Sequence, residues 1–328
     1  MSKEIQAILA TLAQHPDQGT VLATLVKVEG SSYRRPGARL LLLADGSRVG
    51  SISGGCLEDD VVAHARQTLA TGRSETIVYD TTMENDLVWG TGLGCHGIVR
   101  VFIEKLPAAP LWAGTLRGNF AAGRNTRLEI AFDGTSGGTR LASATAVAGA
   151  GIFLEIVPPP TRLTIFGAGD DARPLVRFAK ELGWHVSVAD SRPAYVTAAR
   201  FPEADDLALF RENDLAAATA LDRRALAVVM THRYKDDLPL LRALLPRPLA
   251  YLGLLGPKKR AARILETIVA EGLVITEDMR ANLHAPVGLD LGATTPESVA
   301  LAILAEMQAR LSQRDPIHLR DRTQPIHG

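Results

Sequence analysis

The stretch that decides the fold is Leu163-Thr164-Ile165-Phe166-Gly167-Ala168-Gly169-Asp170-Asp171-Ala172. The apolar residues at its start predict a short buried strand, and residues 172–182 predict a helix. Glycines between a strand and a helix favour a tight turn, in which a diphosphate approaches the helix N-terminus closely. This order of elements predicts the first unit of a Rossmann-like domain.

The sequence after this stretch keeps the same rhythm. Residues 185–189 predict a second strand, and Asp190 follows it 21 residues after Gly169, where a ribose-binding acid is expected. Residues 226–230 and 249–254 predict further strands, each followed by a helical segment. Strands that alternate with helices indicate a parallel, doubly wound sheet. Thr295 and the proline after it predict the start of a last helix.

A bound dinucleotide is less strongly indicated than the fold itself. Gly167, Gly169 and Asp190 are candidate contacts to NAD(P) or FAD. However, Asp170 and Asp171 occupy the helix end where the diphosphate should lie, and carboxylates there repel a phosphate. We therefore expect weak dinucleotide binding, or a site that no longer binds one.

Two further loops of this half follow predicted strands. Thr231-His232 follows one, and Gly256-Pro257-Lys258-Lys259-Arg260 follows another. Three cations at a helix start are a candidate phosphate site, and a solvated basic turn is the alternative. His232 is a candidate ligand or acid–base residue, with a structural hydrogen bond as the alternative.

The three consecutive prolines at 158–160 are the expected boundary between two halves, because they favour a stiff extended linker. We expect an α+β domain over residues 1–106, a small β extension over 107–157, and a linker over 158–161. A Rossmann-like domain with a C-terminal helix should follow over 162–312, and a polar tail over 313–328.

Composition limits the classes of function. The 328 residues carry 36 Lys plus Arg and 36 Asp plus Glu, so the chain lacks the positive charge that attracts nucleic acid. No apolar run is long enough to span a membrane, and the start does not resemble a secretory signal. Two cysteines are too few for a disulfide scaffold and fit a reducing compartment. We expect a cytoplasmic protein.

Both cysteines lie in glycine-rich loops of the first half. One loop is Ser53-Gly54-Gly55-Cys56 and the other contains Cys95-His96. Glycines permit close approach of a ligand and leave backbone donors free, and a helix predicted after Cys56 favours a thiolate. Such a thiolate could bind a soft metal or handle sulfur. Small buried residues in tight turns, or a disulfide, are the alternatives, whereas the spacing does not fit a zinc site.

Taken together, these loops resemble those of the xanthine dehydrogenase accessory proteins, the XdhC/CoxI-like family. The resemblance covers about residues 5–310. Besides the cysteine loops, the glycine turn at Gly167, Thr231-His232 and the Lys258 loop, it rests on the following pieces: Gly30-Ser31-Ser32, Arg35-Pro36-Gly37-Ala38-Arg39, Gly253-Leu254-Leu255-Gly256, and Pro286-Val287-Gly288-Leu289-Asp290-Leu291-Gly292-Ala293 before Thr295.

The resemblance implies a maturation factor rather than an enzyme. Members are thought to bind the molybdenum cofactor, a pterin with a dithiolene and a phosphate or nucleotide. They assist its sulfuration and its insertion into a xanthine or carbon monoxide dehydrogenase. The implied partners are the molybdenum hydroxylase apo-enzyme and a cysteine desulfurase, and we expect a homodimer. An NAD(P)-dependent oxidoreductase and a non-catalytic docking scaffold are the rival functions.

The resemblance also implies roles for particular residues. Cys56 and Cys95 become candidate contacts to molybdenum, within a set of cofactor contacts that includes Ser53, Gly54 and Gly55. Candidate phosphate or pterin contacts are Arg34, Arg35, Lys258, Lys259 and Arg260. Many members have a histidine where this chain has Asp170, and a glycine where it has His96, so His96 is a candidate substitute.

Overall fold

The computed structural model describes residues 2–80, 97–133, 137–211, 215 and 221–323. The chain divides into two compact units, residues 1–160 and 161–328, and the division falls at the three prolines. None of the helices in the described part of the chain is long and apolar enough to cross a membrane.

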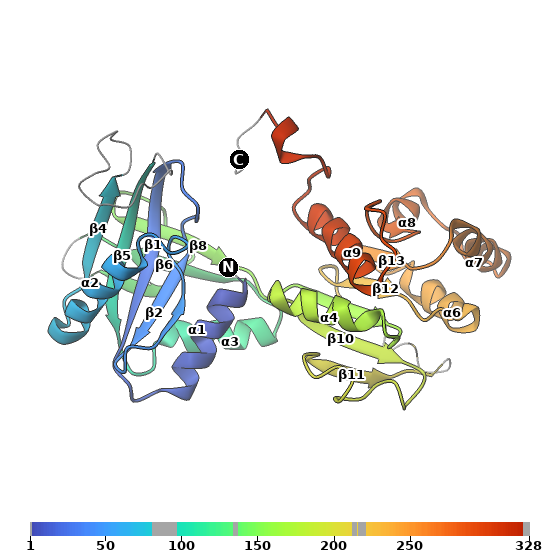
Figure 1. Ribbon diagram of the computed structural model, residues 1–328, viewed down its shortest axis with the longest axis horizontal. Helices are drawn as coiled ribbons and strands as arrows, with labels where there is room; N and C mark the ends of the chain where they lie inside the picture. Colours follow the sequence, from blue (N-terminus) through green and yellow to red (C-terminus); the bar gives the residue numbers. More distant parts are fainter. Residues whose placement is uncertain (1, 81–96, 134–136, 212–214, 216–220, 324–328) are drawn as a thin grey trace. The chain divides into compact units, whose positions relative to one another are not determined.

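The first unit is built on an antiparallel sheet of five strands in the order β3-β2-β1-β5-β4. Two helices that pack on this sheet are α1 (Ser2–Gln14) and α2 (Glu58–Thr71), and α2 crosses the strands in Figure 1. The strands are β1 (Thr20–Gly30), β2 (Arg39–Leu43), β3 (Arg48–Gly50), β4 (Glu75–Asp80) and β5 (Gly97–Leu106).

Both faces of this sheet are buried at β1 and β2, which explains why these two strands are almost continuously apolar. Alternate side chains of β1 point to opposite faces. Val21 and Leu25 pack with α2, whereas Leu22 and Val26 pack with α1 and with the residues that follow β5. Burial of each such side chain contributes about 1.5–3 kcal/mol.

The residues after β5 correct one expectation. The sequence indicated only β structure over 107–157, but a helix, α3 (Leu111–Ala121), precedes a three-stranded antiparallel sheet. Trp112 and Leu116 bury one side of α3 in the same core as α1. The strands are β6 (Thr126–Ala131), β7 (Gly138–Leu141) and β8 (Ile152–Val157), in the order β7-β6-β8.

The second unit confirms the predicted Rossmann-like sheet. Every adjacent pair among its six strands is parallel, and the order is β11-β10-β9-β12-β13-β14. Strands β10 and β11 are added on one side of β9, and strands β12 to β14 are added on its other side. The strand order therefore reverses between β9 and β12. The strands are β9 (Arg162–Phe166), β10 (His185–Asp190), β11 (Asp206–Leu209), β12 (Leu226–Val229), β13 (Tyr251–Leu254) and β14 (Leu283–His284).

Helices cover both faces of this sheet (Figure 1). One core holds Leu163 and Ile165 of β9 with α4 (Ala172–Glu181) and α9 (Pro296–Leu311). The other core holds α6 (Tyr234–Leu244) and α7 (Lys258–Ala270). Thr295 caps α9 as the sequence predicted. A short helix, α8 (Glu277–Asn282), precedes β14, and the 3₁₀ helix η2 (Leu319–Asp321) lies in the tail.

Candidate functional site

The loop that carries Cys56 is organised around the carboxylate of Glu58, the first residue of α2. Glu58 is buried and accepts hydrogen bonds from the loop before it. Gly54 and Gly55 have φ of +119° and +122°, the left-handed region that glycine tolerates best. The donors are Ser51 Oγ at 2.7 Å, the Ser53 hydroxyl, and the backbone N–H groups of Ile52 at 3.1 Å, Ser53 at 2.9 Å, Gly54 at 3.2 Å and Gly55 at 2.8 Å.

These hydrogen bonds determine the charge of Glu58. Burial by itself would raise its pKa, because it disfavours the charged form. The bonds from the Ser53 and Ser51 hydroxyls and from the backbone outweigh burial and hold the pKa of Glu58 well below its ordinary value. The loop therefore surrounds a permanently charged carboxylate at neutral pH.

This arrangement corrects the expectation that the glycines leave backbone donors free. The N–H groups of Gly54 and Gly55 both donate to Glu58, so they do not await a ligand anion. Cys56 is exposed and forms no disulfide with any described residue. Cys95 and His96 lie outside the described residues. The feature that this loop offers to a ligand is therefore the Cys56 thiol.

An open pocket of about 620 Å³ lies beside this loop. It contains Arg34 and Arg35, together with Ser51 at the start of the cysteine loop. Arg34 donates to Glu4 of α1 at 2.5 Å, which fixes its guanidinium at the wall. The structure thus brings both predicted arginines and the cysteine loop into one region of the first unit. The full lining is Lys3, Glu4, Ala7, Tyr33, Arg34, Arg35, Gly50 and Ser51.

In the second unit, the glycine turn after β9 also encloses a carboxylate. Gly167 has φ +124°, and a Cβ there would lie 2.4 Å from the Met230 carbonyl oxygen, so only glycine fits. Asp190 is fully buried at the end of β10. It accepts from Ala168 N at 2.7 Å and from Arg192 Nε at 2.9 Å and Nη2 at 2.7 Å.

Asp190 is therefore fully engaged by protein groups. Burial would raise its pKa, but the hydrogen bonds from Arg192 and Ala168 outweigh burial and lower it. The sequence suggested that Asp190 binds a ribose. In the structure both of its oxygens accept hydrogen bonds from the turn and from Arg192, so a ribose hydroxyl would have to compete with these groups, and ribose binding stays a prediction.

His232 follows β12 and lies at the point between β9 and β12 where the strand order reverses. Its Nε2 lies 2.6 Å from the Asp171 carboxylate, and its φ of 59° is unusual for a residue other than glycine. The bond to Asp171 raises the pKa of His232 despite partial burial. Asp170 pairs with Arg200 at 2.9 Å. Both acids of the turn are thus paired with basic side chains of this unit.

The three cations at the start of α7 do not act as one cluster. Arg260 pairs with Asp237, which is fully buried and also accepts from Thr231 Oγ1 at 2.5 Å. Lys258 and Lys259 are exposed at the first turn of the helix. Arg260 is therefore a structural partner of α6, and a phosphate site here would have to use the lysines alone.

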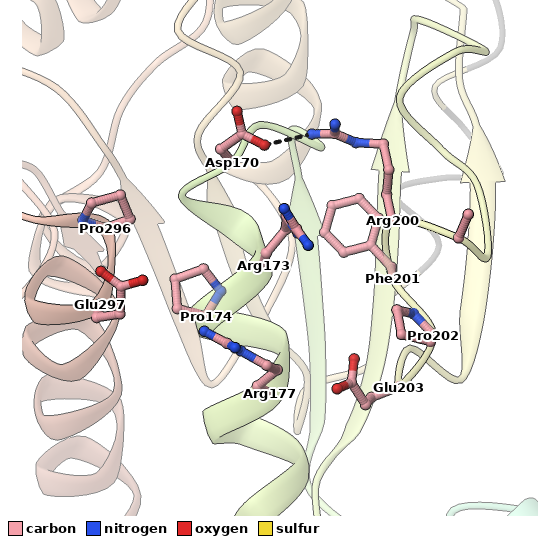
Figure 2. A pocket seen from close by; sticks show the side chains of 11 residues that line it. Asp170, Arg173, Pro174, Arg177, Arg200, Phe201, Pro202, Glu203, Pro296 and Glu297 are labelled. Atoms are coloured by element: carbon pink, nitrogen blue, oxygen red, sulfur yellow. Dashed lines mark hydrogen bonds and ion pairs between the residues drawn. The ribbon is translucent and has the colours of Figure 1, made fainter.

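A second pocket, of about 450 Å³, lies along α4. Figure 2 shows Arg173 and Arg177 on α4 and Arg200 across from them. Three carboxylates, those of Asp170, Glu203 and Glu297, line the same pocket. The formal charges of the lining therefore cancel, and we assign no ligand to this pocket.

Sequence reasoning missed Glu58 and Tyr33 as site residues. The signal for Glu58 was present, because an acid in the first turn of a helix is well placed to accept backbone N–H groups. Tyr33 gave no signal, because one aromatic residue in a polar loop has no distinguishing pattern. Among the described residues, no three His, Cys, Asp or Glu side chains gather into a metal site.

Comparison with known proteins gives a consistent result over both units. The model of the XdhC and CoxI family matches residues 13–80, and that of the XdhC Rossmann domain matches residues 163–307. A probable xanthine dehydrogenase subunit from Bacillus subtilis is 34% identical, over 88% of this chain and 92% of that protein. The molybdenum cofactor insertion chaperone PaoD of Escherichia coli is 25% identical, over 91% of this chain and 86% of that protein.

A solved structure covers nearly the whole chain. It is that of a xanthine dehydrogenase from Bacillus halodurans, and it is 30% identical with a TM-score of 0.81. The match spans 99% of this chain and 98% of that one, so both units have counterparts there.

Proposed function

Because the chain belongs to the XdhC and CoxI family, we propose that it is an accessory factor that binds the molybdenum cofactor and assists its insertion into a molybdenum hydroxylase. The name of the Escherichia coli relative, a molybdenum cofactor insertion chaperone, supports this role. The observation that carries the proposal is the exposed Cys56 thiol, presented by a loop that Glu58 holds in place.

The residues of the first unit fit the chemistry of this cargo. A soft thiolate suits the molybdenum and sulfur end of the cofactor. Arg34 and Arg35 suit its anionic end, since guanidinium groups bind phosphate strongly. The metal would keep the dithiolene of its own pterin, and the thiol of Cys56 would add a contact from this chain.

We propose two partner proteins for this factor. The client would be an apo-enzyme of the xanthine or carbon monoxide dehydrogenase type, and a cysteine desulfurase would supply sulfur. Cys95 and His96 remain candidate contacts to the same cofactor. We also propose a homodimer, and a cytoplasmic location in which the Cys56 thiol would stay reduced.

Substitution of Cys56 tests the proposal. The protein would be co-expressed with cofactor biosynthesis, purified without oxygen and weighed by native mass spectrometry. We expect the wild type to retain the cofactor, and Cys56→Ala and Cys56→Ser to lose it. The free energy of unfolding should change by less than about 0.5 kcal/mol, because the side chain is exposed. Full retention by both variants would contradict a role for this thiol.

The rival functions predict different spectra of the same sample. A dehydrogenase should carry a nicotinamide or flavin absorbance, and a docking scaffold should carry none. Binding of NAD(P) or FAD should be weak, because Asp190 is engaged by Arg192 and the acids of the Gly167 turn remain beside the helix start. A molybdopterin absorbance would favour the accessory factor.

A further inference from the structure

We propose that Tyr33 is a stacking platform for a planar heteroaromatic ring that carries an anionic group. The site is the pocket between α1, the β1–β2 loop and the start of the cysteine loop. If the proposed function holds, this ring is the flat pyrimidine ring of the cofactor's pterin, and the inference rests on that function only for the identity of the ligand.

The first observation is the placement of the Tyr33 ring. Tyr33 is 71% exposed, which is high for an aromatic side chain. It nevertheless lies against the cysteine loop, because a Cβ on Gly54 would be 2.9 Å from its Cε1 and 3.0 Å from its Cδ1. Gly54 thus lets the ring rest on the loop backbone, while most of the side-chain surface stays accessible to a ligand.

The second observation is the charge of the pocket. Its lining includes the cations Lys3, Arg34 and Arg35 but only one carboxylate, Glu4. The formal charges of this lining therefore sum to a positive value, whereas those of the pocket along α4 cancel. The volume of about 620 Å³ lies within the range of about 300–1,000 Å³ that is typical of small-molecule sites.

These features together specify a class of ligand. An aromatic ring favours stacking with another flat ring, and the surrounding cations favour an anionic substituent. Cys56 lies two positions after Gly54 in the loop that supports Tyr33. A ligand that has a flat ring, an anion and a sulfur-bearing group would therefore find a counterpart for each in one region.

Pterin-6-carboxylate is a suitable probe, because it is flat, anionic, fluorescent and free of metal. Its affinity would be measured by fluorescence quenching for the wild type, Tyr33→Phe and Tyr33→Ala. Leu111→Ala is the matched control, since Leu111 is an exposed apolar residue of the same unit. Circular dichroism and thermal unfolding would verify that each variant folds.

We expect Tyr33→Phe to bind within about twofold of the wild type, because the ring is kept, and the control to be unchanged. Tyr33→Ala should bind at least about fivefold more weakly, since loss of aromatic stacking costs about 1–3 kcal/mol per ring. Equal affinity for Tyr33→Ala and the wild type would overturn the proposal, as would the absence of probe binding to the wild type.

Retention of the intact cofactor separates this inference from the proposed function. If pterin binding depends on Tyr33 but the wild type retains no molybdenum cofactor, the platform stands and the proposed function fails. If the wild type retains the cofactor and Tyr33→Ala retains it equally well, with unchanged probe affinity, the platform fails and the function stands.

Discussion

Each of the two glycine loops of this protein, one in each unit, donates to a buried carboxylate, but the two carboxylates come from different places in the chain. In the first unit, Glu58 comes from the helix that directly follows the loop, so the acid and its donors lie within eight residues, 51–58. In the second unit, Asp190 comes from the neighbouring strand, and Ala168, one of its two backbone donors, lies 22 residues before it. The first arrangement is local, whereas the second ties two strands together.

The comparison shows that a glycine loop before a helix is not by itself an empty anion site. The first loop directs four backbone N–H groups at a carboxylate and the second directs one, that of Ala168, and in both the chain supplies the anion itself. What differs is the group left exposed: the first loop presents the Cys56 thiol, and the second is surrounded by the ion pairs of Asp170 and Asp171. The first loop is therefore suited to contact a ligand, whereas the second mainly stabilises its unit.

Replacing Glu58 should give the largest effect on stability. In Glu58→Gln, the buried loop donors lose their charged acceptor, so we expect a loss of about 3 kcal/mol or more in the free energy of unfolding. Urea unfolding followed by circular dichroism would measure it. Asp59→Asn is the matched control, because its side chain is fully exposed on the same helix turn. A loss below about 1 kcal/mol would contradict the local arrangement.

The wild type and Glu58→Gln should also differ in how their free energy of unfolding depends on pH. The pKa of Glu58 is lower in the folded protein than its ordinary value of 4.5, so its stabilising contribution is present above 4.5 and is lost as the pH falls further. Glu58→Gln should lack this part of the acid dependence. Unfolding curves between pH 7 and pH 3.5 would compare them.

Replacing Asp190 should have a smaller effect, about 2 kcal/mol for Asp190→Asn. The asparagine oxygen can still accept from Ala168, and Arg192, whose side chain is 30% exposed, can turn toward water. Hydrogen exchange of the amides in β9 and β10 would report the loss in the second unit. Asp206→Asn, at an exposed position, should change stability by less than about 0.5 kcal/mol. Equal effects of the two substitutions would show that Asp190 does not tie the strands.

The smallest effect concerns His232. Its pKa in the folded protein lies above the ordinary 6.5, so its contribution to stability is present below pH 6.5 and is lost as the pH rises through the raised pKa. The pKa should fall in Asp171→Asn and stay raised in Asp170→Asn, because Asp170 pairs with Arg200 instead. Titration of the ring protons by NMR would measure it. The stability change should be slight, because the side chain is 56% exposed.

The parallel sheet could be predicted because the Gly167 turn lies between a strand and a helix, and the same alternation recurs after it. The helix α3 could not, because Gly114 and Gly118 lower its intrinsic helix propensity and burial of Trp112 and Leu116 compensates. The partners of Glu58 and Asp190 were also missed. The local sequence pattern indicates where backbone donors are concentrated, but it does not indicate which carboxylate accepts hydrogen bonds from them.

The burial of β1 on both of its faces determines where the first unit can be cut without exposing its core. Leu22, Val26 and Phe102 share one core with α3, β6 and β8. A chain cut after residue 106 would expose that face of the sheet, which favours aggregation. The residues from 107 to 157 are therefore not a dispensable appendage. The smallest fragment of this half suitable for expression alone should extend to the prolines at 158–160.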